Sequence, residues 1–171
     1  MAIQRLNHAV LYVSDVTRSV AFYTDVLGFT IKVDLGKAAF LQAAGSTNDH
    51  DLGLFEVGPG AAPSQAGRGT VGLYHLAWEV DTLAELQRIG DALSAAGALV
   101  GATDHATTKA LYARDPDGIE FEVCWLVPAD LLHTIDAGAA MKLRPLDLAE
   151  EIARYGAETR GGIGVSTPLP A

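Results

Sequence analysis

Two histidines and one glutamate occupy regular places in this sequence. His8 and His75 each end a Leu-x-His motif, and each is followed by the alternating apolar residues of a predicted strand. Glu122 lies on another predicted strand, four residues after the Asp-Pro-Asp-Gly turn that ends at Gly118. Two imidazoles and one carboxylate that met at one point would form a 2-His-1-carboxylate triad, which leaves coordination positions open and is used by non-haem Fe(II) oxygenases. These residue types therefore predict a metal site.

Three further residues could move protons or bind polar atoms: His50, His105 and Tyr112. An imidazole with an ordinary pKa of about 6.5 gives and takes protons at neutral pH. Each residue also has an ordinary interpretation. His50 stands between two aspartates and could be a solvated loop residue, while Tyr112 could be a common strand aromatic.

Two residues near Glu122, Glu120 and Cys124, are alternative candidates for a metal ligand. Glu120 faces the same side of a regular strand as Glu122, because residues two apart do so. Cys124 lies two residues beyond Glu122, and we interpret it as a small core residue rather than a ligand.

The elements that must position these residues form an internal repeat. The segments LNHAVLYVSDV and LYHLAWEVDTL both predict a strand followed by an aspartate, Asp15 or Asp81, that suits a helix N-cap. A helix follows in each copy and ends near Gly28 or Gly97, which suits the left-handed position after a helix. Three strands then follow in each copy, over 30–34, 37–43 and 51–57 in the first and 99–103, 108–114 and 119–126 in the second.

Two copies of βαβββ predict an α+β fold of two modules. If the modules pack about a pseudo-twofold axis, equivalent strands converge and bring His8 and His75 together. We expect one domain over residues 1–127, with modules at 4–57 and 71–127 joined by a Gly-, Pro-, Ala- and Ser-rich loop at 58–70, and a C-terminal extension and tail over 128–171 with helices at 128–140 and 147–155.

The composition excludes several partners. The formal net charge is -9, with 12 Lys plus Arg and no basic block, so we expect no nucleic acid. No run of about 18 apolar residues predicts a membrane span, and the first residues show no secretory signal. The single cysteine forbids an intrachain disulfide, which fits the cytoplasm, where we expect the protein.

The two modules resemble the vicinal oxygen chelate superfamily, which includes glyoxalase I, fosfomycin and bleomycin resistance proteins, methylmalonyl-CoA epimerase and type I extradiol dioxygenases. NHAVLYVSDVTRSVAFYTDVLGF is typical of the first module, and YHLAWEVDTLAELQRIGDALSAAG with RDPDGIEFEV is typical of the second. The resemblance covers residues 5–125. It implies curved mixed sheets that form a cleft around a divalent metal, with His8, His75 and Glu122 as the ligands.

Within the superfamily the chain is most similar to single-domain type I extradiol (catechol 2,3-) dioxygenases. Their signature is a histidine, a hydrophobic-Tyr pair, an Asp-Pro turn and the ligand glutamate, matched here by His105, Tyr112, the turn and Glu122. The resemblance implies that His50 is the acid/base catalyst and that His105 and Tyr112 hydrogen-bond the substrate oxygens. It also implies Fe(II), with Mn(II) accepted by the same ligands, an aromatic diol and O2 as substrates, and a homodimer or higher homo-oligomer.

A lyase or isomerase of the glyoxalase I or epimerase type is the main alternative. Those enzymes add a glutamate from the last strand of module one, and Glu56 is the candidate because LFEV at 54–57 echoes EFEV at 120–123. An isomerase has no evident use for His50, His105 and Tyr112 together, which favours the dioxygenase. A non-catalytic binding protein is a further alternative, but binding members typically lack the metal ligands that this chain has.

Overall fold

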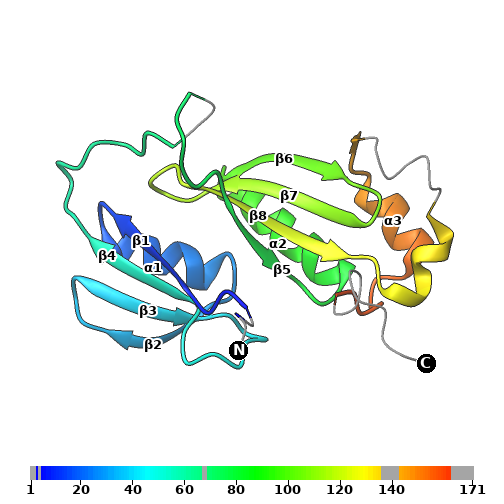
Figure 1. Cartoon of the computed structure of the whole chain (residues 1–171), viewed down its shortest axis with the longest axis horizontal. Helices are drawn as coiled ribbons and strands as arrows, with labels where there is room; N and C mark the ends of the chain where they lie inside the picture. Colours follow the sequence, from blue (N-terminus) through cyan, green and yellow to red (C-terminus); the bar gives the residue numbers. More distant parts are fainter. Residues whose placement is uncertain (1–2, 4, 67–68, 136–142, 163–171) are drawn as a thin grey trace. The chain divides into compact units, whose positions relative to one another are not determined.

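The computed structural model describes residue 3 and residues 5–66, 69–135 and 143–162 of the chain. They fall into two compact units, one of Met1–Gln65 with Asp115–Ile119 and one of Ala66–Arg114 with Glu120–Ala171. Each unit carries one copy of the repeat as a mixed sheet with a helix, which confirms the α+β class (Figure 1).

The first unit is a four-stranded sheet with one helix. The strand order is β1-β4-β3-β2, in which β1 runs parallel to β4 and the other neighbours are antiparallel. Its elements are β1 (Ala9–Val13), α1 (Val16–Asp25), β2 (Thr30–Asp34), β3 (Ala38–Gln42) and β4 (Leu52–Glu56).

Alternation along the strands gives this sheet one buried and one exposed face. Leu11 and Leu54 are buried, and they belong to the core with Tyr23 of α1. Val10 and Tyr12, the alternate residues of β1, are exposed, as period-two geometry requires. The predicted cap of α1 is confirmed, since the Asp15 carboxylate accepts a hydrogen bond from the N–H of Arg18.

A turn from the second repeat completes the first unit. The segment Asp115–Ile119 lies in this unit, although the strands on both sides of it belong to the other. The Ser14 hydroxyl donates to Asp117 Oδ1 at 2.6 Å, and Arg18 pairs with the same oxygen at 2.7 Å. The Tyr23 hydroxyl donates to Asp115 at 3.3 Å, and burial raises the pKa values of both groups.

The second unit is a five-stranded sheet of order β5-β8-β7-β6-β9. β5 and β8 are parallel, and the other neighbours are antiparallel. Its elements are β5 (Leu76–Glu79), α2 (Leu83–Ala95), β6 (Leu99–Asp104), β7 (Thr108–Arg114), β8 (Glu120–Leu126), a 3-10 helix (Ala129–Thr134), β9 (Arg144–Pro145) and α3 (Leu148–Tyr155).

Helix α2 covers one face of this sheet through Leu83, Leu86, Ile89 and Leu93. A side chain at Gly90 would meet Leu111 of β7 at 3.2 Å, so the helix approaches the strand closely there. The predicted N-cap Asp81 is wrong by one residue. Thr82 is the cap, because its hydroxyl accepts from the N–H of Glu85, the Thr-x-x-Glu spacing of a capping box.

The C-terminal extension differs from the prediction in two ways. The first predicted helix, 128–140, is a short 3-10 helix over Ala129–Thr134, and residues 136–140 of its range lie outside the described residues. Arg144 and Pro145 pair with β6 as an unpredicted edge strand, where proline is tolerated. The second helix is confirmed, beginning after the Asp147 cap. No helix among the described residues is long and apolar enough to cross a membrane.

Candidate functional site

The second unit brings His75 and Glu122 together. Glu122 pairs with Ala77 of β5, and His75 precedes Ala77 by two residues, so both side chains face the same side of the sheet. His75 Nε2 lies 3.2 Å from Glu122 Oε2. Two ligands that each lie about 2.1 Å from one ion are separated by about this distance. The pair therefore fits two of the three predicted metal ligands.

One atom of this pair is unsatisfied by the protein. His75 Nδ1 is buried and has no hydrogen-bond partner among the described residues. A buried polar atom of this kind usually marks an ordered water, an ion or a catalytic role.

The competing carboxylate, Glu120, is engaged elsewhere. It lies opposite Arg114 in the β7–β8 ladder, and the Arg114 guanidinium contacts Glu120 Oε1 at 2.7 Å. An ion pair of this geometry leaves Glu122 as the carboxylate beside His75.

Tyr112 and His105 form a hydrogen-bonded pair beside Glu122. Tyr112 lies directly opposite Glu122 in the ladder, and its ring centroid is 5.9 Å from that of His75. The Tyr112 hydroxyl and His105 Nε2 are 2.8 Å apart. Burial, with Glu122 nearby, raises the pKa of Tyr112, and its hydroxyl can donate a hydrogen bond.

Cys124 does not add a ligand to this group. The thiol is buried, and burial, with further contributions from Glu122 and Glu79, raises its pKa to about 12. Burial thus disfavours the thiolate, which is the form that attacks or binds a metal. This agrees with the interpretation of Cys124 as a core residue.

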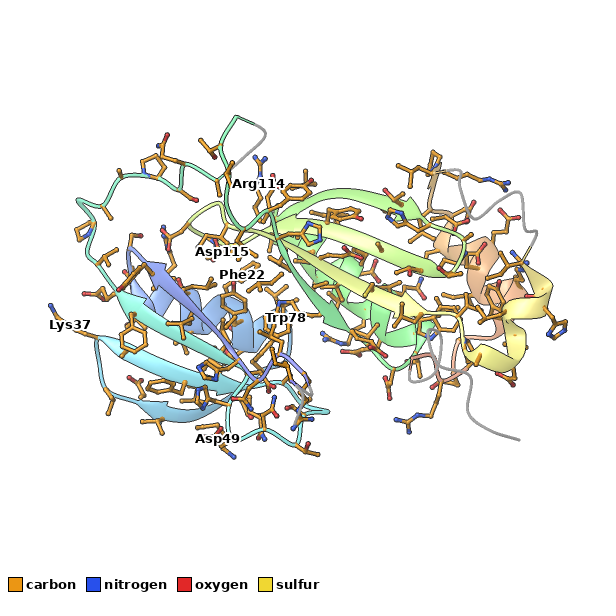
Figure 2. The ribbon with its side chains drawn as sticks, viewed as in Figure 1. Phe22, Lys37, Asp49, Trp78, Arg114 and Asp115 are labelled. Carbon is orange, nitrogen blue, oxygen red and sulfur yellow. The ribbon has the colours of Figure 1, made fainter. Side chains whose placement is uncertain are left out.

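The first unit brings His8 and His50 together. The residues precede the neighbouring strands β1 and β4, and their ring centroids are 4.6 Å apart. His50 Nδ1 lies 3.1 Å from Asp49 Oδ2, and hydrogen bonding by His50 lowers the pKa of Asp49. Figure 2 shows Asp49 in the loop before β4. Sequence reasoning missed Asp49 as the residue that orients His50.

The six predicted site residues are thus divided between the units. His8 and His50 belong to the first, whereas His75, His105, Tyr112 and Glu122 belong to the second. Over the residues that the structure describes, no three His, Cys, Asp or Glu side chains form a group that could hold a metal. The convergence of His8 with His75 and Glu122 stays a prediction.

Strand register identifies the counterpart of Glu122 in the first unit. The residue after His8, Ala9, pairs with Leu52, as the residue after His75, Leu76, pairs with Phe121. Glu122 therefore corresponds to Gly53, not to Glu56 as the echo of LFEV and EFEV predicted. The sequence similarity was misleading because the position in β4 that matches Glu122 of β8 is Gly53, three residues before Glu56.

Glu56 is occupied by other partners. Its carboxylate accepts from the N–H of Val16 at the start of α1, at 3.3 Å, and lies 3.9 Å from Lys37. In β4 it alternates in phase with the buried Leu54, on the sheet face opposite Gly53. This placement disfavours Glu56 as a fourth ligand.

Comparison with known proteins supports a relationship to one superfamily. The model of the Glyoxalase/Bleomycin resistance protein/Dioxygenase superfamily matches residues 5–123. A catechol-2,3-dioxygenase of Bacillus subtilis (strain 168) is 33% identical over 118 residues, 69% of this chain, and the chain spans only 40% of the length of that relative.

Solved structures show the same fold. A glyoxylase/bleomycin resistance protein/dioxygenase domain from Frankia sp. EAN1pec has a TM-score of 0.62 at 22% identity, over 78% of this chain and 99% of that one. Lactoylglutathione lyase from Agrobacterium tumefaciens has a TM-score of 0.54 at 23% identity, over 72% and 95%. Because the family model spans most of both repeats, the chain belongs to the glyoxalase/bleomycin resistance protein/dioxygenase superfamily.

Proposed function

We propose that this protein is an Fe(II)-dependent extradiol dioxygenase that opens the ring of a catechol-type diol with O2. His8, His75 and Glu122 hold the metal, and Mn(II) is the other ion that this ligand set accepts. The observation that carries the proposal is the His105–Tyr112 hydrogen bond directly beside the His75–Glu122 pair. The relative named catechol-2,3-dioxygenase supports the same reaction class.

The metal, when bound, supplies a template for the diol oxygens and O2 and an electron path between them. Proton transfer is the task of His50. Its Nδ1 faces Asp49, which leaves Nε2 free to take a proton from a substrate hydroxyl and later to return one to an oxygen of the ring-opening product. A positioned imidazole can act as both base and acid near neutral pH.

Tyr112 and His105 bind and orient the substrate oxygens. The phenol of Tyr112 is protonated at neutral pH, as a tyrosine ordinarily is, and burial raises its pKa further, so it donates to a substrate oxygen that carries negative charge. His105 sets the direction of that hydroxyl through the 2.8 Å hydrogen bond. Donors fixed in advance stabilise developing charge more than water does.

Anaerobic loading with Fe(II), followed by air and a panel of catechols, tests the proposal. We expect a yellow ring-opened semialdehyde product from at least one diol, and no product without iron. Absence of product with every diol, combined with turnover of a hemithioacetal, would instead assign the chain to the glyoxalase-type lyases and isomerases.

A variant of His50 tests the acid/base role. His50→Gln should retain metal and diol binding but lower kcat by about 100-fold or more, the usual contribution of a positioned acid/base. Turnover equal to that of the unaltered protein would remove His50 from the mechanism.

A further inference from the structure

The turn that carries His105 has an unusual backbone. Ala106 has a φ of +66°, the left-handed region that side chains other than glycine rarely adopt. The Asp104 carboxylate accepts a hydrogen bond from the N–H of Ala106 at 2.8 Å. The N–H of His105 donates to the carbonyl of Thr108 at 2.9 Å. These contacts close a tight turn between β6 and β7 and aim His105 at Tyr112.

The carboxylate that shapes this turn is itself held by a buried lysine. Lys109 is 1% exposed, and its Nζ lies 2.5 Å from Asp104 Oδ1, the oxygen that also accepts from Ala106. Burial acts to raise the pKa of Asp104, but hydrogen bonds from Lys109 and Ala106 outweigh burial and hold the pKa below its ordinary value. Lys109 thus fixes the acceptor that keeps the turn closed.

The same ammonium contacts the C-terminal extension. Glu151 of α3 places Oε2 2.9 Å from Lys109 Nζ, as an ion pair without the angles of a hydrogen bond. Glu151 is 7% exposed, and the ring of Tyr155, also on α3, lies 5.8 Å from the ammonium. Buried charges are retained when they have partners of opposite sign, so these three charges depend on one another.

The extension reaches the turn from the sheet edge as well. Arg144 of β9 pairs with Asp104 of β6 in the ladder, and its charge also acts on the Asp104 carboxylate. Two parts of the C-terminal extension therefore act on this turn: β9 pairs with Asp104, and α3 contacts Lys109, which holds Asp104.

We propose that Lys109 is a positioning residue, which uses Asp104 and Glu151 to hold the β6–β7 turn so that His105 meets Tyr112, and that the C-terminal helix thereby controls this hydrogen bond. Without the ammonium, Asp104 and Glu151 would be two carboxylates with no cation between them. Asp104 would move away, Ala106 would leave the left-handed region, and His105 would turn away from Tyr112. The effect on turnover rests on the proposed function, whereas the effect on the hydrogen bond does not.

The 15N shifts of the His105 imidazole test the proposal in metal-free protein, because they report the ring tautomer and its hydrogen bond. His105→Gln assigns the signals, and Tyr112→Phe gives the values of a ring without its partner. Lys109→Met should move the His105 shifts most of the way to the Tyr112→Phe values, and Glu151→Gln should move them in the same direction by less.

Glu150→Gln is the matched control, since Glu150 precedes Glu151 on α3 but is exposed, whereas Glu151 is buried against Lys109. It should leave the His105 signals unchanged. Folded Lys109→Met with unchanged signals would overturn the proposal. If Lys109→Met does not fold, unchanged signals in Glu151→Gln would overturn it equally.

Activity adds an independent readout in the iron-loaded enzyme. Glu151→Gln should lower kcat on a catechol more than it raises KM, since it misdirects the Tyr112 and His105 donors without removing either of them. If the unaltered protein turns over no diol, the proposed function fails, and the imidazole signals still decide the role of Lys109.

Discussion

The two sheets share a topology but differ at the positions where chemistry is expected. The strand registers match Phe40 with Tyr112 and Gly53 with Glu122. At a third matched position, His8 and His75, both units keep a candidate ligand. The first sheet thus presents apolar or small side chains where the second presents a phenol and a carboxylate. At these two matched positions the candidate polar groups lie in the second unit.

The turns that lead into β3 and β7 differ in the same way. Asp34 accepts from the N–H of Gly36 at 2.8 Å, as Asp104 does from Ala106. Gly36, at a φ of +79°, adopts the left-handed region without strain. Its neighbour Leu35 is exposed, where the second turn presents His105. The second turn holds the candidate site residue His105 and uses a charged network where the first uses glycine.

The largest difference expected between the sheets is in metal affinity. Glu122→Ala should abolish saturable Fe(II) or Mn(II) binding in anaerobic calorimetry, a loss above the 10–100-fold typical of residues that only support ligands, about 100-fold at least. Gly53→Ala, at the corresponding position, should bind normally because the added Cβ meets only Val10 at 3.4 Å and Phe40 at 3.6 Å. Glu120→Gln should also bind normally. Retained binding in Glu122→Ala would remove that residue from the ligand set.

The two repeat lysines should differ next. Lys37 and Lys109 occupy the same place in KAAFLQ and KALYAR, yet the Lys37 side chain is 86% exposed and that of Lys109 1%. Figure 2 shows Lys37 extending outward from the turn between β2 and β3.

Lys109→Met should lower the free energy of unfolding by about 3 kcal/mol, because it leaves the buried Glu151 and the half-buried Asp104 without the ammonium that both contact. Lys37→Met should change it by less than about 0.5 kcal/mol, as expected for a surface site. Urea unfolding of both variants checks this. Equal losses would mean that the Lys109 network contributes no more than a surface charge.

The exchange of aromatic residues should have a smaller effect. Tyr112→Phe loses the hydrogen bond to His105 and should lower the free energy of unfolding by about 1 kcal/mol. Phe40→Tyr adds a hydroxyl near His50, since the ring centroids of Phe40 and His50 are 5.0 Å apart. We expect this variant to raise the free energy of unfolding by much less than about 1 kcal/mol. Thermal unfolding distinguishes the two. No cost in Tyr112→Phe would show that the phenol–imidazole contact is not a stabilising one.

The smallest effect concerns the two turns. Ala106→Gly should raise the free energy of unfolding by about 0.5 kcal/mol, since relief of the left-handed alanine exceeds the entropic cost of glycine. Gly36→Ala should lower it by about 1 kcal/mol for the opposite reason. The midpoints of denaturant unfolding measure both changes in stability. Changes of the same sign in the two variants would contradict this interpretation.

Much of the fold could be predicted because each repeat contains residues that mark where its helices and strands begin and end. Asp15, Gly28 and Gly97 mark helix ends as expected, and Gly28 and Gly97 have φ values of +74° and +66°. Strand ranges follow from alternation, and 30–34 and 108–114 agree with β2 and β7 residue for residue. Local chemistry determines these elements, so local sequence is sufficient to find them.

The rest depends on contacts distant in sequence. Glu56 looked like the mate of Glu122 because similar letters surround both, but pairing between strands, which the letters do not show, decides the equivalence. Lys109 was missed as well. Its only sequence signal is a lysine in phase with the core residues Leu111 and Ala113, and its partner Glu151 lies on a helix outside the repeat.

The position of the turn Asp115–Ile119 bears on whether the two repeats can be separated. The turn belongs to the second repeat by order and to the first unit by contact. A fragment that ends in the linker would therefore leave Ser14, Arg18 and Tyr23 without their partners Asp115 and Asp117. The first repeat alone thus lacks contacts that it has in the whole chain. Expression of the two repeats as separate fragments would therefore place the partners of this contact set on different chains.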